Sequence, residues 1–117
     1  MATILVVEDD HFMRELLFMH LEAAGHRVHL AEDAVIAGHL LVEQRIDLVL
    51  SDIQMPYMDG LDFVQAMRND PSVAHLPVVF FTSHGEHESR AKELGAGFLR
   101  KPMPASQVVA AIAQRLH

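Results

Sequence analysis

Cysteine is absent from this chain of 117 residues, and long hydrophobic runs are absent as well. Without cysteine, disulfide bonds and thiol catalysis are excluded, and the composition fits a reducing compartment, so we expect a cytoplasmic protein. The apolar run at 4–7 is interrupted by Glu8, and no later stretch approaches the roughly 18 uninterrupted apolar residues of a membrane span. We therefore expect no membrane association.

Basic charge is also scarce. Nine Lys and Arg residues stand against 16 Asp and Glu residues, which gives a formal net charge of -7, and no run of Lys or Arg occurs. The counterion-release attraction that drives nucleic-acid binding is therefore missing, and direct binding of nucleic acid by this chain is not expected. Half of the residues are hydrophobic, which is enough for one core, so residues 1–117 are predicted to form one domain.

Three short apolar runs have the composition of strands that are buried on both faces. They lie at 4–7, 48–50 and 78–81, and each is bounded by turn signals. Two further segments, at 27–30 and 97–100, mix polar with apolar residues, which is typical of strands at the edges of a sheet. The three apolar runs are therefore expected inside a sheet, and the two mixed segments at its edges.

Helical patterns alternate with these strands. Four of them carry a clear apolar stripe: at 13–24 before Gly25, at 36–41 after a predicted N-cap at Asp33, at 63–67 and at 105–116. A fifth, within Glu86 to Leu94, has a poor apolar side and is expected to dock weakly and to move easily. Regular alternation implies parallel crossovers. The predicted fold is an α/β, flavodoxin-like, doubly wound five-stranded parallel sheet of order 2-1-3-4-5 with five helices.

Polar and charged groups follow four of the predicted strands. Glu8 and Asp9 follow the first, Asp52 the third, Thr82 the fourth and Lys101 the fifth. Because the carboxyl ends of parallel strands meet at one edge of the sheet, we expect these groups to lie together near the point where the strand order reverses. A carboxylate cluster, a hydroxyl and an ammonium group can together bind one phosphoryl group and one hard cation.

The carboxylates of Glu8, Asp9 and Asp52 would repel one another unless a cation relieved them. Mg2+ is the predicted cofactor, with Mn2+ as an alternative, because it prefers oxygen ligands and bridges to phosphate. Asp9 and Asp52 are predicted as direct ligands, Glu8 as a ligand through water, and the backbone carbonyl of Gln54 as a further ligand. The free oxygen of Asp52 can then attack phosphorus and form an aspartyl phosphate.

Thr82 and Lys101 complete this chemistry. The Lys101 ammonium would neutralise phosphoryl oxygens, and the Thr82 hydroxyl would donate a hydrogen bond to one of them. Structural interpretations compete with this one: Asp10 can serve only as a helix N-cap, Thr82 can simply end a strand, and Lys101 can be a solvated charge. The matching groups at four strand ends, in the matching order, favour the functional interpretation.

These motifs resemble those of the bacterial two-component receiver domain, the phosphoacceptor module of response regulators such as the chemotaxis regulators. The resemblance covers the whole chain and is carried by 4–10, 50–56, 58–60, Thr82 and Lys101–Pro102. It implies that Asp52 accepts a phosphoryl group from a histidine of a sensor kinase or a histidine phosphotransfer protein, in a Mg2+-dependent reaction. It further implies a switch rather than an enzyme, a monomer or a weak phosphorylation-dependent dimer that controls a downstream effector or a covalently linked output domain.

The same resemblance assigns conformational roles. Thr82 is expected to move toward the phosphoryl group. Phe98 stands where Tyr is common and is expected to turn inward in the active state. The face built from 86–94, 97–100 and 105–116 is then expected to carry the output signal.

Three local expectations also come from the resemblance. The Lys101–Pro102 bond is expected to be cis. Gln54 lies two residues after Asp52, and His84 lies two residues after Thr82. Both are expected to influence the rate of dephosphorylation.

Three other functions compete with the receiver interpretation. An aspartate-nucleophile phosphatase of the haloacid-dehalogenase type needs a second Asp two residues after the first, where this chain has Gln54. A flavodoxin-like flavin binder needs a phosphate loop after the first strand, where Glu8-Asp9-Asp10 would repel the flavin phosphate. A receiver-like interaction module that works without phosphorylation stays open, although neither Asp52 nor Lys101 is lost.

Nine histidines raise the question of a transition-metal site. His84 and His87 are near the candidate site, and His26 and His29 are close to each other in the sequence. No pair combines the helical i, i+4 spacing with a third ligand, so the sequence does not predict a dedicated transition-metal site. His20 lies on the apolar side of the first helix and is expected to be hydrogen-bonded at the edge of the core.

Overall fold

Five parallel strands form the centre of the computed structural model, which describes residues 1–116. Their order is β2-β1-β3-β4-β5, and each neighbouring pair is parallel. The predicted topology is therefore confirmed, with its reversal between β1 and β3. The strands are β1 (Thr3–Val7), β2 (Arg27–Ala31), β3 (Leu48–Ser51), β4 (Val78–Thr82) and β5 (Gly97–Arg100).

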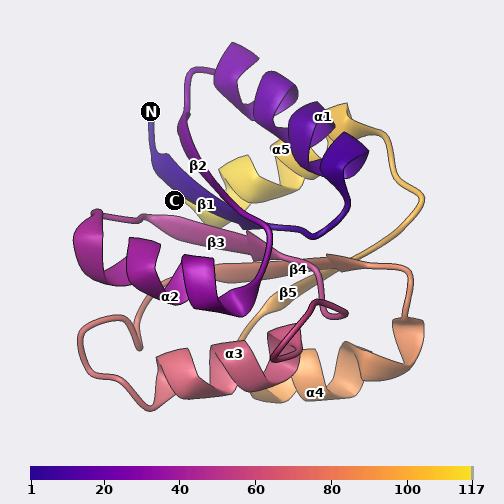
Figure 1. Cartoon of the computed structure of the whole chain (residues 1–117). Helices are drawn as coiled ribbons and strands as arrows, with labels where there is room; N and C mark the ends of the chain where they lie inside the picture. Colours follow the sequence, from indigo (N-terminus) through magenta and orange to yellow (C-terminus); the bar gives the residue numbers. More distant parts are fainter. Residues whose placement is uncertain (117) are drawn as a thin grey trace.

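Helices cover both faces of this sheet. Helices α1 and α5 lie on one face, and α2, α3 and α4 lie on the other (Figure 1). A short 3-10 helix, η1, precedes α4. The helices are α1 (His11–Ala23), α2 (Ala34–Glu43), α3 (Gly60–Arg68), η1 (Gly85–His87), α4 (Glu88–Glu93) and α5 (Ala105–Arg115).

The core is divided by the sheet into two clusters. Successive side chains of a strand point to opposite faces, and β1 follows this rule: Leu5 and Val7 belong to the cluster under α2 and α3, whereas Ile4 and Val6 belong to the cluster under α1 and α5. Strands β1, β3 and β4 are buried almost throughout, and β2 and β5 are partly exposed. The predicted division into inner and edge strands is therefore confirmed.

Aspartate side chains fix the starts of three helices. Asp10 accepts a hydrogen bond from the backbone N–H of Met13 at 2.8 Å, and Asp33 accepts one from that of Ile36 at 2.9 Å. Asp59 caps α3 in the same way. A capping carboxylate satisfies backbone donors that have no partner within the helix. Asp10 therefore has the structural role that its sequence position allowed.

The buried side of α1 is narrower than its sequence pattern indicates. Leu17 and Leu21 are buried, but His20 and Ala24 are exposed and Leu16 keeps 42% of its surface. The expectation that His20 sits at the edge of the core is therefore wrong. Two buried leucines are enough to hold α1 against the sheet because α1 also packs against α5.

Helix α4 is the shortest α-helix of the described residues, and it lies within the predicted segment Glu86 to Leu94. Its six residues bury only Ala91, while Leu94 at its end is also buried. The residues before it form the 3-10 turn η1 instead. A helix with so little buried apolar surface is held weakly, which agrees with the expectation from its sequence.

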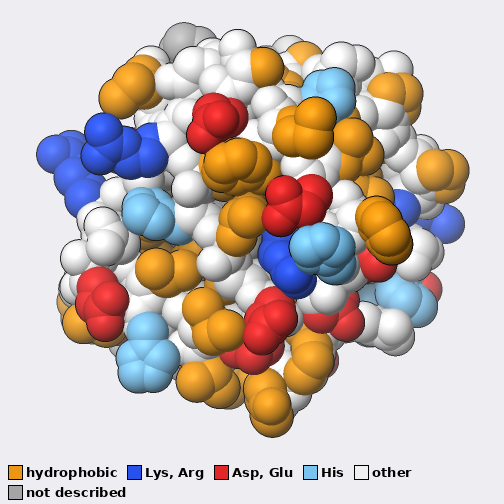
Figure 2. Space-filling model, turned by 45° about the horizontal axis from the view of Figure 1, so that its top comes forward, with side chains coloured by type: hydrophobic (Ala, Val, Ile, Leu, Met, Phe, Trp, Pro, Cys, Tyr) orange, Lys and Arg blue, Asp and Glu red, His pale blue; other side chains and the backbone are white. Residues whose placement is uncertain are grey.

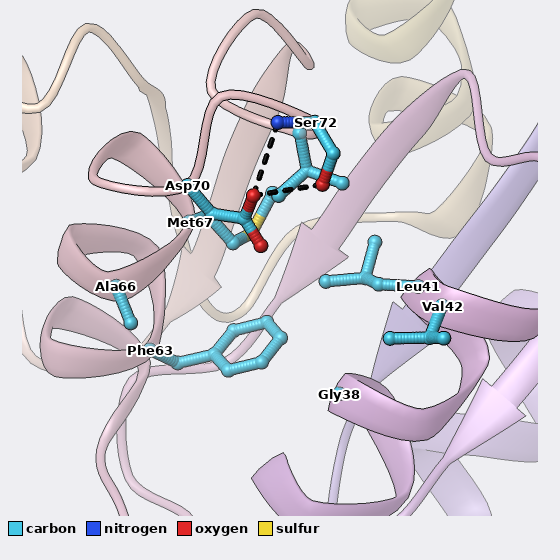
Figure 3. A pocket seen from close by; sticks show the side chains of 9 residues that line it. Gly38, Leu41, Val42, Phe63, Ala66, Met67, Asp70 and Ser72 are labelled. Carbon is cyan, nitrogen blue, oxygen red and sulfur yellow. Dashed lines mark hydrogen bonds between the residues drawn. The ribbon is translucent and has the colours of Figure 1, made fainter.

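A hollow of about 380 Å³ lies between α2 and α3 (Figure 3). Leu41, Phe63 and Met67 line it, and Gly38 leaves room at its wall because a Cβ atom there would meet nothing within 4 Å. Asp70 at its rim accepts hydrogen bonds from Ser72. None of the residues that line the hollow is one of the polar groups that follow the strands, which are Glu8, Asp9, Asp52, Thr82 and Lys101.

No helix within residues 1–116 is both long and apolar enough to cross a bilayer.

Candidate functional site

The predicted acidic groups and the lysine meet at the carboxyl edge of the sheet. The Nζ atom of Lys101 lies 2.7 Å from Oε1 of Glu8 and 2.9 Å from Oδ2 of Asp52. Carboxylate oxygens of Glu8, Asp9 and Asp52 all lie within 4.8 Å of one another. One ammonium group therefore bridges two members of a three-carboxylate cluster, hereafter the acidic trio.

Glu8 is the buried member of the acidic trio, with 2% of its surface exposed. Its position follows from strand pairing, because its backbone N–H donates to the carbonyl of Ala31 at 2.9 Å and so extends the contact of β1 with β2. Burial raises the pKa of Glu8 above its ordinary value, and the hydrogen bond from Lys101 only partly opposes this effect. Glu8 therefore binds protons more readily than a solvated glutamate.

Asp52 lies where β3 ends and is held from two sides. Its backbone N–H donates to the carbonyl of Val7 at 2.9 Å, which ties it to β1. Its Oδ1 atom accepts a hydrogen bond from the backbone N–H of Ile53 at 2.6 Å, while Oδ2 faces Lys101. The side chain keeps 12% of its surface exposed, so the carboxylate is oriented and still reachable from solvent.

Lys101 is placed by the end of β5. Its backbone N–H donates to the carbonyl of Thr82 at 2.8 Å, and the Lys101–Pro102 bond is cis, as the resemblance implied. Burial would lower the pKa of Lys101, but the hydrogen bonds and charges of Glu8 and Asp52 outweigh burial and raise it. The ammonium also lies 5.4 Å from the centre of the Phe81 ring. Lys101 is therefore a permanently charged counterion for the acidic trio.

Thr82 ends β4 and is fully buried. Its Oγ1 atom accepts a hydrogen bond from the backbone N–H of His84 at 3.2 Å, so the hydroxyl is tied to the loop that follows. Phe98, on the neighbouring strand β5, is half-buried against the core. Gln54 is exposed in the loop after Asp52. The structure thus gathers the acidic trio and Lys101 tightly, whereas within residues 1–116 the Gln54 side chain forms no hydrogen bond with them and Phe98 packs against the core.

Two supporting residues escaped the sequence interpretation. The guanidinium of Arg14 donates to the backbone carbonyls of Glu8 and Asp9, at 2.9 and 3.3 Å. The hydroxyl of Ser51 donates to the carbonyl of Asp52 at 2.7 Å. Both position the backbone that carries the acidic trio. Neither residue is part of a recognisable motif. Only their positions in the sequence could have indicated a role: Arg14 lies one turn into α1, and Ser51 directly precedes Asp52.

Gly60 is a further supporting residue because it brings the backbone of α3 against the loop after Asp52. Its N–H donates to the carbonyl of Ile53 at 2.6 Å, and a Cβ atom at Gly60 would collide with the carbonyl oxygen of Asp52. The Asp59-Gly60 pair was recognisable in the sequence as a turn. The need for glycine comes from this close approach, which only the fold reveals.

We expect Gly60→Ala to lower the free energy of unfolding by about 1–3 kcal/mol, the usual effect of overpacking, and to disturb Asp52. Gly38→Ala is the matched control, because Gly38 lies in α2 with open space around its Cβ direction. Alanine there is expected to add about 0.5–1 kcal/mol of stability. Urea unfolding of both variants measures these changes. Equal stability of the two variants would contradict the close approach at Gly60.

The donor set of the acidic trio suits a hard divalent cation. Three carboxylates from Glu8, Asp9 and Asp52 supply oxygen ligands, the type that Mg2+ and Mn2+ prefer. Asp9 is exposed and leaves the cluster open to solvent on one side. An ion that keeps several of its water molecules can therefore be accommodated. The residues present fit such an ion.

The surface in Figure 2 shows acidic side chains gathered with basic and histidine side chains, with hydrophobic side chains around them. Hydrophobic residues are unusually exposed on α1, where Phe12 keeps 83% and Met19 keeps 63% of its surface. Because α1 begins two residues after Asp9, the exposed apolar side chains start within its first turn, at Phe12, and extend away along the helix to Met19.

The fold and these strand-end groups define a signalling receiver module. The family model of the response regulator receiver domain matches residues 4–113, and the chain belongs to this family. The resemblance noted from the sequence is thereby confirmed. The function of the family is that of a phosphoacceptor switch in two-component signalling, and neither the phosphatase nor the phosphorylation-independent module is favoured.

Curated relatives show the same membership. The DNA-binding dual master transcriptional regulator RpaA of Synechocystis is 30% identical over 115 residues, covering 96% of this chain and 48% of RpaA. The phosphate regulon transcriptional regulatory protein PhoB of Escherichia coli is 35% identical over 112 residues, covering 93% of this chain and 49% of PhoB. The chain thus spans about half the length of these relatives. An uncharacterised 14.6 kDa protein of Leptolyngbya boryana is 35% identical, covering 95% of this chain and 87% of that protein.

Solved structures agree on the fold. The chemotaxis response regulator CheY4 of Vibrio cholerae superposes with a TM-score of 0.89 at 31% identity, covering 100% of this chain and 99% of that chain. The non-phosphorylated HemR receiver domain of Leptospira biflexa gives a TM-score of 0.89 at 28% identity, covering 99% of this chain and 94% of that chain. The flavodoxin-like architecture of receivers is therefore shared over the whole chain.

Proposed function

We propose that Asp52 is the phosphoacceptor of this receiver. The observation that carries the proposal is the shared contact of Lys101 with Glu8 and Asp52, at 2.7 and 2.9 Å, beside a solvent-reachable carboxylate. In the reaction, a carboxylate oxygen of Asp52 forms a bond to phosphorus while the P–N bond of a donor phosphohistidine breaks. The electron pair of that bond returns to the imidazole, which takes up a proton from solvent. The product is an aspartyl phosphate.

The acidic trio is the proposed binding site for Mg2+, with Mn2+ as an alternative. Glu8, Asp9, Asp52 and the backbone carbonyl of Gln54 would hold the ion, with Glu8 acting through water. When bound, the ion supplies positive charge to the phosphoryl oxygens. The protein supplies the rest: the Ile53 N–H orients Asp52, and Lys101 follows the negative charge from the carboxylate to the phosphoryl group.

Thr82 is the proposed link between this chemistry and a change of shape. In the present structure its hydroxyl oxygen is bound by the N–H of His84. Donation of the hydroxyl hydrogen to a phosphoryl oxygen would turn Thr82 toward Asp52 and pull on the loop that leads to α4. Because α4 is weakly packed, it can respond to that pull. Phe98, half-buried on β5 beside this helix, would then turn inward.

The output surface is therefore the face of α4, β5 and α5. RpaA and PhoB, which are described as transcriptional regulators, are each about twice as long as the part that they share with this chain. A linked output domain or a separate effector would read the state of α4. Self-association, where it occurs, would be weak and would depend on phosphorylation.

The donor would dock on α1. Phe12, Leu16 and Met19 are exposed at spacings of four and three residues, which places them along one side of the helix. An exposed apolar stripe of this kind fits the helices of another protein. Because the stripe begins at Phe12, three residues after Asp9, a histidine carried by a helical kinase or phosphotransfer domain could reach Asp52 from there.

Intact-mass measurement after incubation with acetyl phosphate tests the proposed function. One phosphoryl adduct per chain is expected with Mg2+, and none after chelation of the ion. A folded protein that forms no adduct under either condition would overturn the proposal. It would redirect attention to partners that bind without phosphorylation.

Gln54 and His84 are proposed to set the lifetime of the adduct. An amide at Gln54 cannot act as a general base, but it can hold the attacking water by a hydrogen bond, and the His84 imidazole can do the same. Gln54→Ala and His84→Ala are therefore each expected to lengthen the half-life of the phosphoryl group, measured by mass spectrometry after the donor is removed. Unchanged half-lives in both variants would contradict this role.

A further inference from the structure

The hollow between α2 and α3 is an apolar space that the protein itself does not fill (Figure 3). Its volume of about 380 Å³ lies within the range of sites that bind small organic molecules. Phe63 and Met67 of α3 form one side of it and are buried, whereas Leu41 and Val42 of α2 form the other side. Val42 is almost fully exposed, so apolar surface continues out to the mouth of the hollow.

One carboxylate lies at the rim of this hollow. Asp70 uses a single oxygen, Oδ1, to accept hydrogen bonds from the backbone N–H of Ser72 at 3.0 Å and from its hydroxyl at 2.8 Å. Within residues 1–116, the other oxygen, Oδ2, accepts no hydrogen bond, and it points into the space between the two helices (Figure 3). The hydrogen bonds from the hydroxyl and the N–H of Ser72 hold the pKa of Asp70 below its ordinary value. The carboxylate is therefore an anion at neutral pH.

No basic side chain offsets this charge among the described residues that line the hollow. Helix α3 ends at Arg68, and the carbonyl end of a helix carries partial negative charge, which adds to that of Asp70. Arg68 itself donates hydrogen bonds to three backbone carbonyls, so its guanidinium is already occupied. The adjoining hollow has both Arg45 and Asp47 in its lining, and their charges cancel. The rim is therefore suited to a cation.

We propose that this hollow binds a small organic cation, in which an apolar body such as an aromatic ring or a branched chain carries one ammonium group. The apolar body would lie between Phe63 and Leu41, and the ammonium group would pair with Oδ2 of Asp70. Apolar contact would supply most of the binding, and the ion pair would select cations over neutral molecules. The net charge of -7 favours the approach of cations in general. This site is independent of the phosphoacceptor role of Asp52.

Gly38 offers a way to close the hollow without disturbing the core. It lies in the wall that α2 provides, and a Cβ atom there would meet nothing within 4 Å. Leucine also favours the helix more than glycine does. Gly38→Leu should therefore fold and place its side chain in the space that the apolar body of the ligand needs.

NMR titration of the full chain with phenylbutylamine tests the site. We expect changes in amide chemical shift centred on α2, α3 and residues 70–73, with a dissociation constant in the millimolar range for a ligand of about eleven non-hydrogen atoms. The neutral analogue phenylbutanol should bind about two- to fivefold more weakly, which is the effect of one partly exposed ion pair. An ionic strength of roughly 0.15 M screens charges that lie far from the ligand.

Three variants separate the apolar contact from the ion pair. Asp70→Asn should bind the amine about two- to fivefold more weakly and the alcohol as wild type does, because asparagine keeps an oxygen for Ser72. Asp62→Asn is the matched control, since Asp62 is exposed on the same helix and does not line the hollow. It should bind both ligands as wild type does. Gly38→Leu should lose the binding of both.

Shift changes centred elsewhere, such as on the exposed side of α1, would overturn the site. Undiminished binding of the amine by Gly38→Leu would do the same, and the spectra of this variant also report whether it is folded. If it is not folded, Asp70→Asn still decides the matter. Equal affinities of wild type for the amine and the alcohol, or equal affinities of wild type and Asp70→Asn for the amine, would overturn the pairing of a cation with Asp70.

Discussion

Asp52→Asn is expected to abolish formation of the phosphoryl adduct and to leave the protein folded. The amide lacks the nucleophilic carboxylate oxygen, but its carbonyl oxygen can still accept the hydrogen bond from the Ile53 N–H. Lys101 keeps Glu8 as its partner at 2.7 Å, so no buried charge loses all of its neutralisation. Intact mass after incubation with acetyl phosphate and Mg2+ measures the adduct, and circular dichroism measures the fold.

The matched control is Asp10→Asn. Asp10 stands two residues from Glu8 and caps α1, and asparagine caps helices about as well as aspartate does. This variant should therefore form the adduct as wild type does. An adduct that persists in Asp52→Asn would place the acceptor elsewhere. Loss of the adduct in Asp10→Asn would show that the whole acidic segment, rather than Asp52 alone, governs the reaction.

The strand-end pattern explains why so much of the site was predictable. A parallel sheet brings its carboxyl ends to one edge, so the order of apolar runs and the residues that follow them fix which side chains meet. Glu8, Asp9, Asp52 and Lys101 follow this logic, and the structure brings them together. The role of Asp33 as a helix cap was also predictable, because a cap is a local sequence signal that does not depend on the rest of the fold.

Features that depend on the exact path of the backbone were not predictable in this way. Residues 85–87 form a 3-10 turn, and nothing in the sequence distinguishes that turn from the start of an α-helix. The prediction that His20 lies at the edge of the core was wrong. The apolar stripe of a helix shows which side of the helix faces the core, but it does not show how wide the buried surface on that side is. Arg14 acts through backbone carbonyls, which carry no sequence signal.

The ion pairs of the site orient the proposed phosphoacceptor Asp52 and its neighbour Lys101. Without a cation, Lys101 is the group that offsets the charges of Glu8 and Asp52, and both carboxylates hold the ammonium within 3 Å. A bound Mg2+ would take over part of this neutralisation. Lys101 would then be free to follow the incoming phosphoryl group. We propose that the same residue serves first as a structural counterion and then as a ligand of the product.

Lys101→Met tests both of these roles. Removing the ammonium takes away one preorganised positive group from the phosphoryl oxygens, an effect of about 100- to 1000-fold on rate in comparable oxyanion sites. The rate of adduct formation with acetyl phosphate and Mg2+ is expected to fall by that order. Lys92→Met on the exposed side of α4 is the control, and its rate should be unchanged.

The stability of Lys101→Met should also fall more steeply with rising pH than the stability of the wild type does. Burial already raises the pKa of Glu8 above its ordinary value, and loss of Lys101 removes the hydrogen bond and charge that oppose this shift. A carboxyl whose pKa is higher in the folded state favours folding when protonated. The variant should therefore lose stability as pH rises from the unfolded pKa through the folded pKa of Glu8. Thermal melting in mildly acidic and neutral buffers measures this loss, and Mg2+ should restore stability at neutral pH. A melting temperature that falls equally at both pH values would show that Lys101 contributes packing rather than charge.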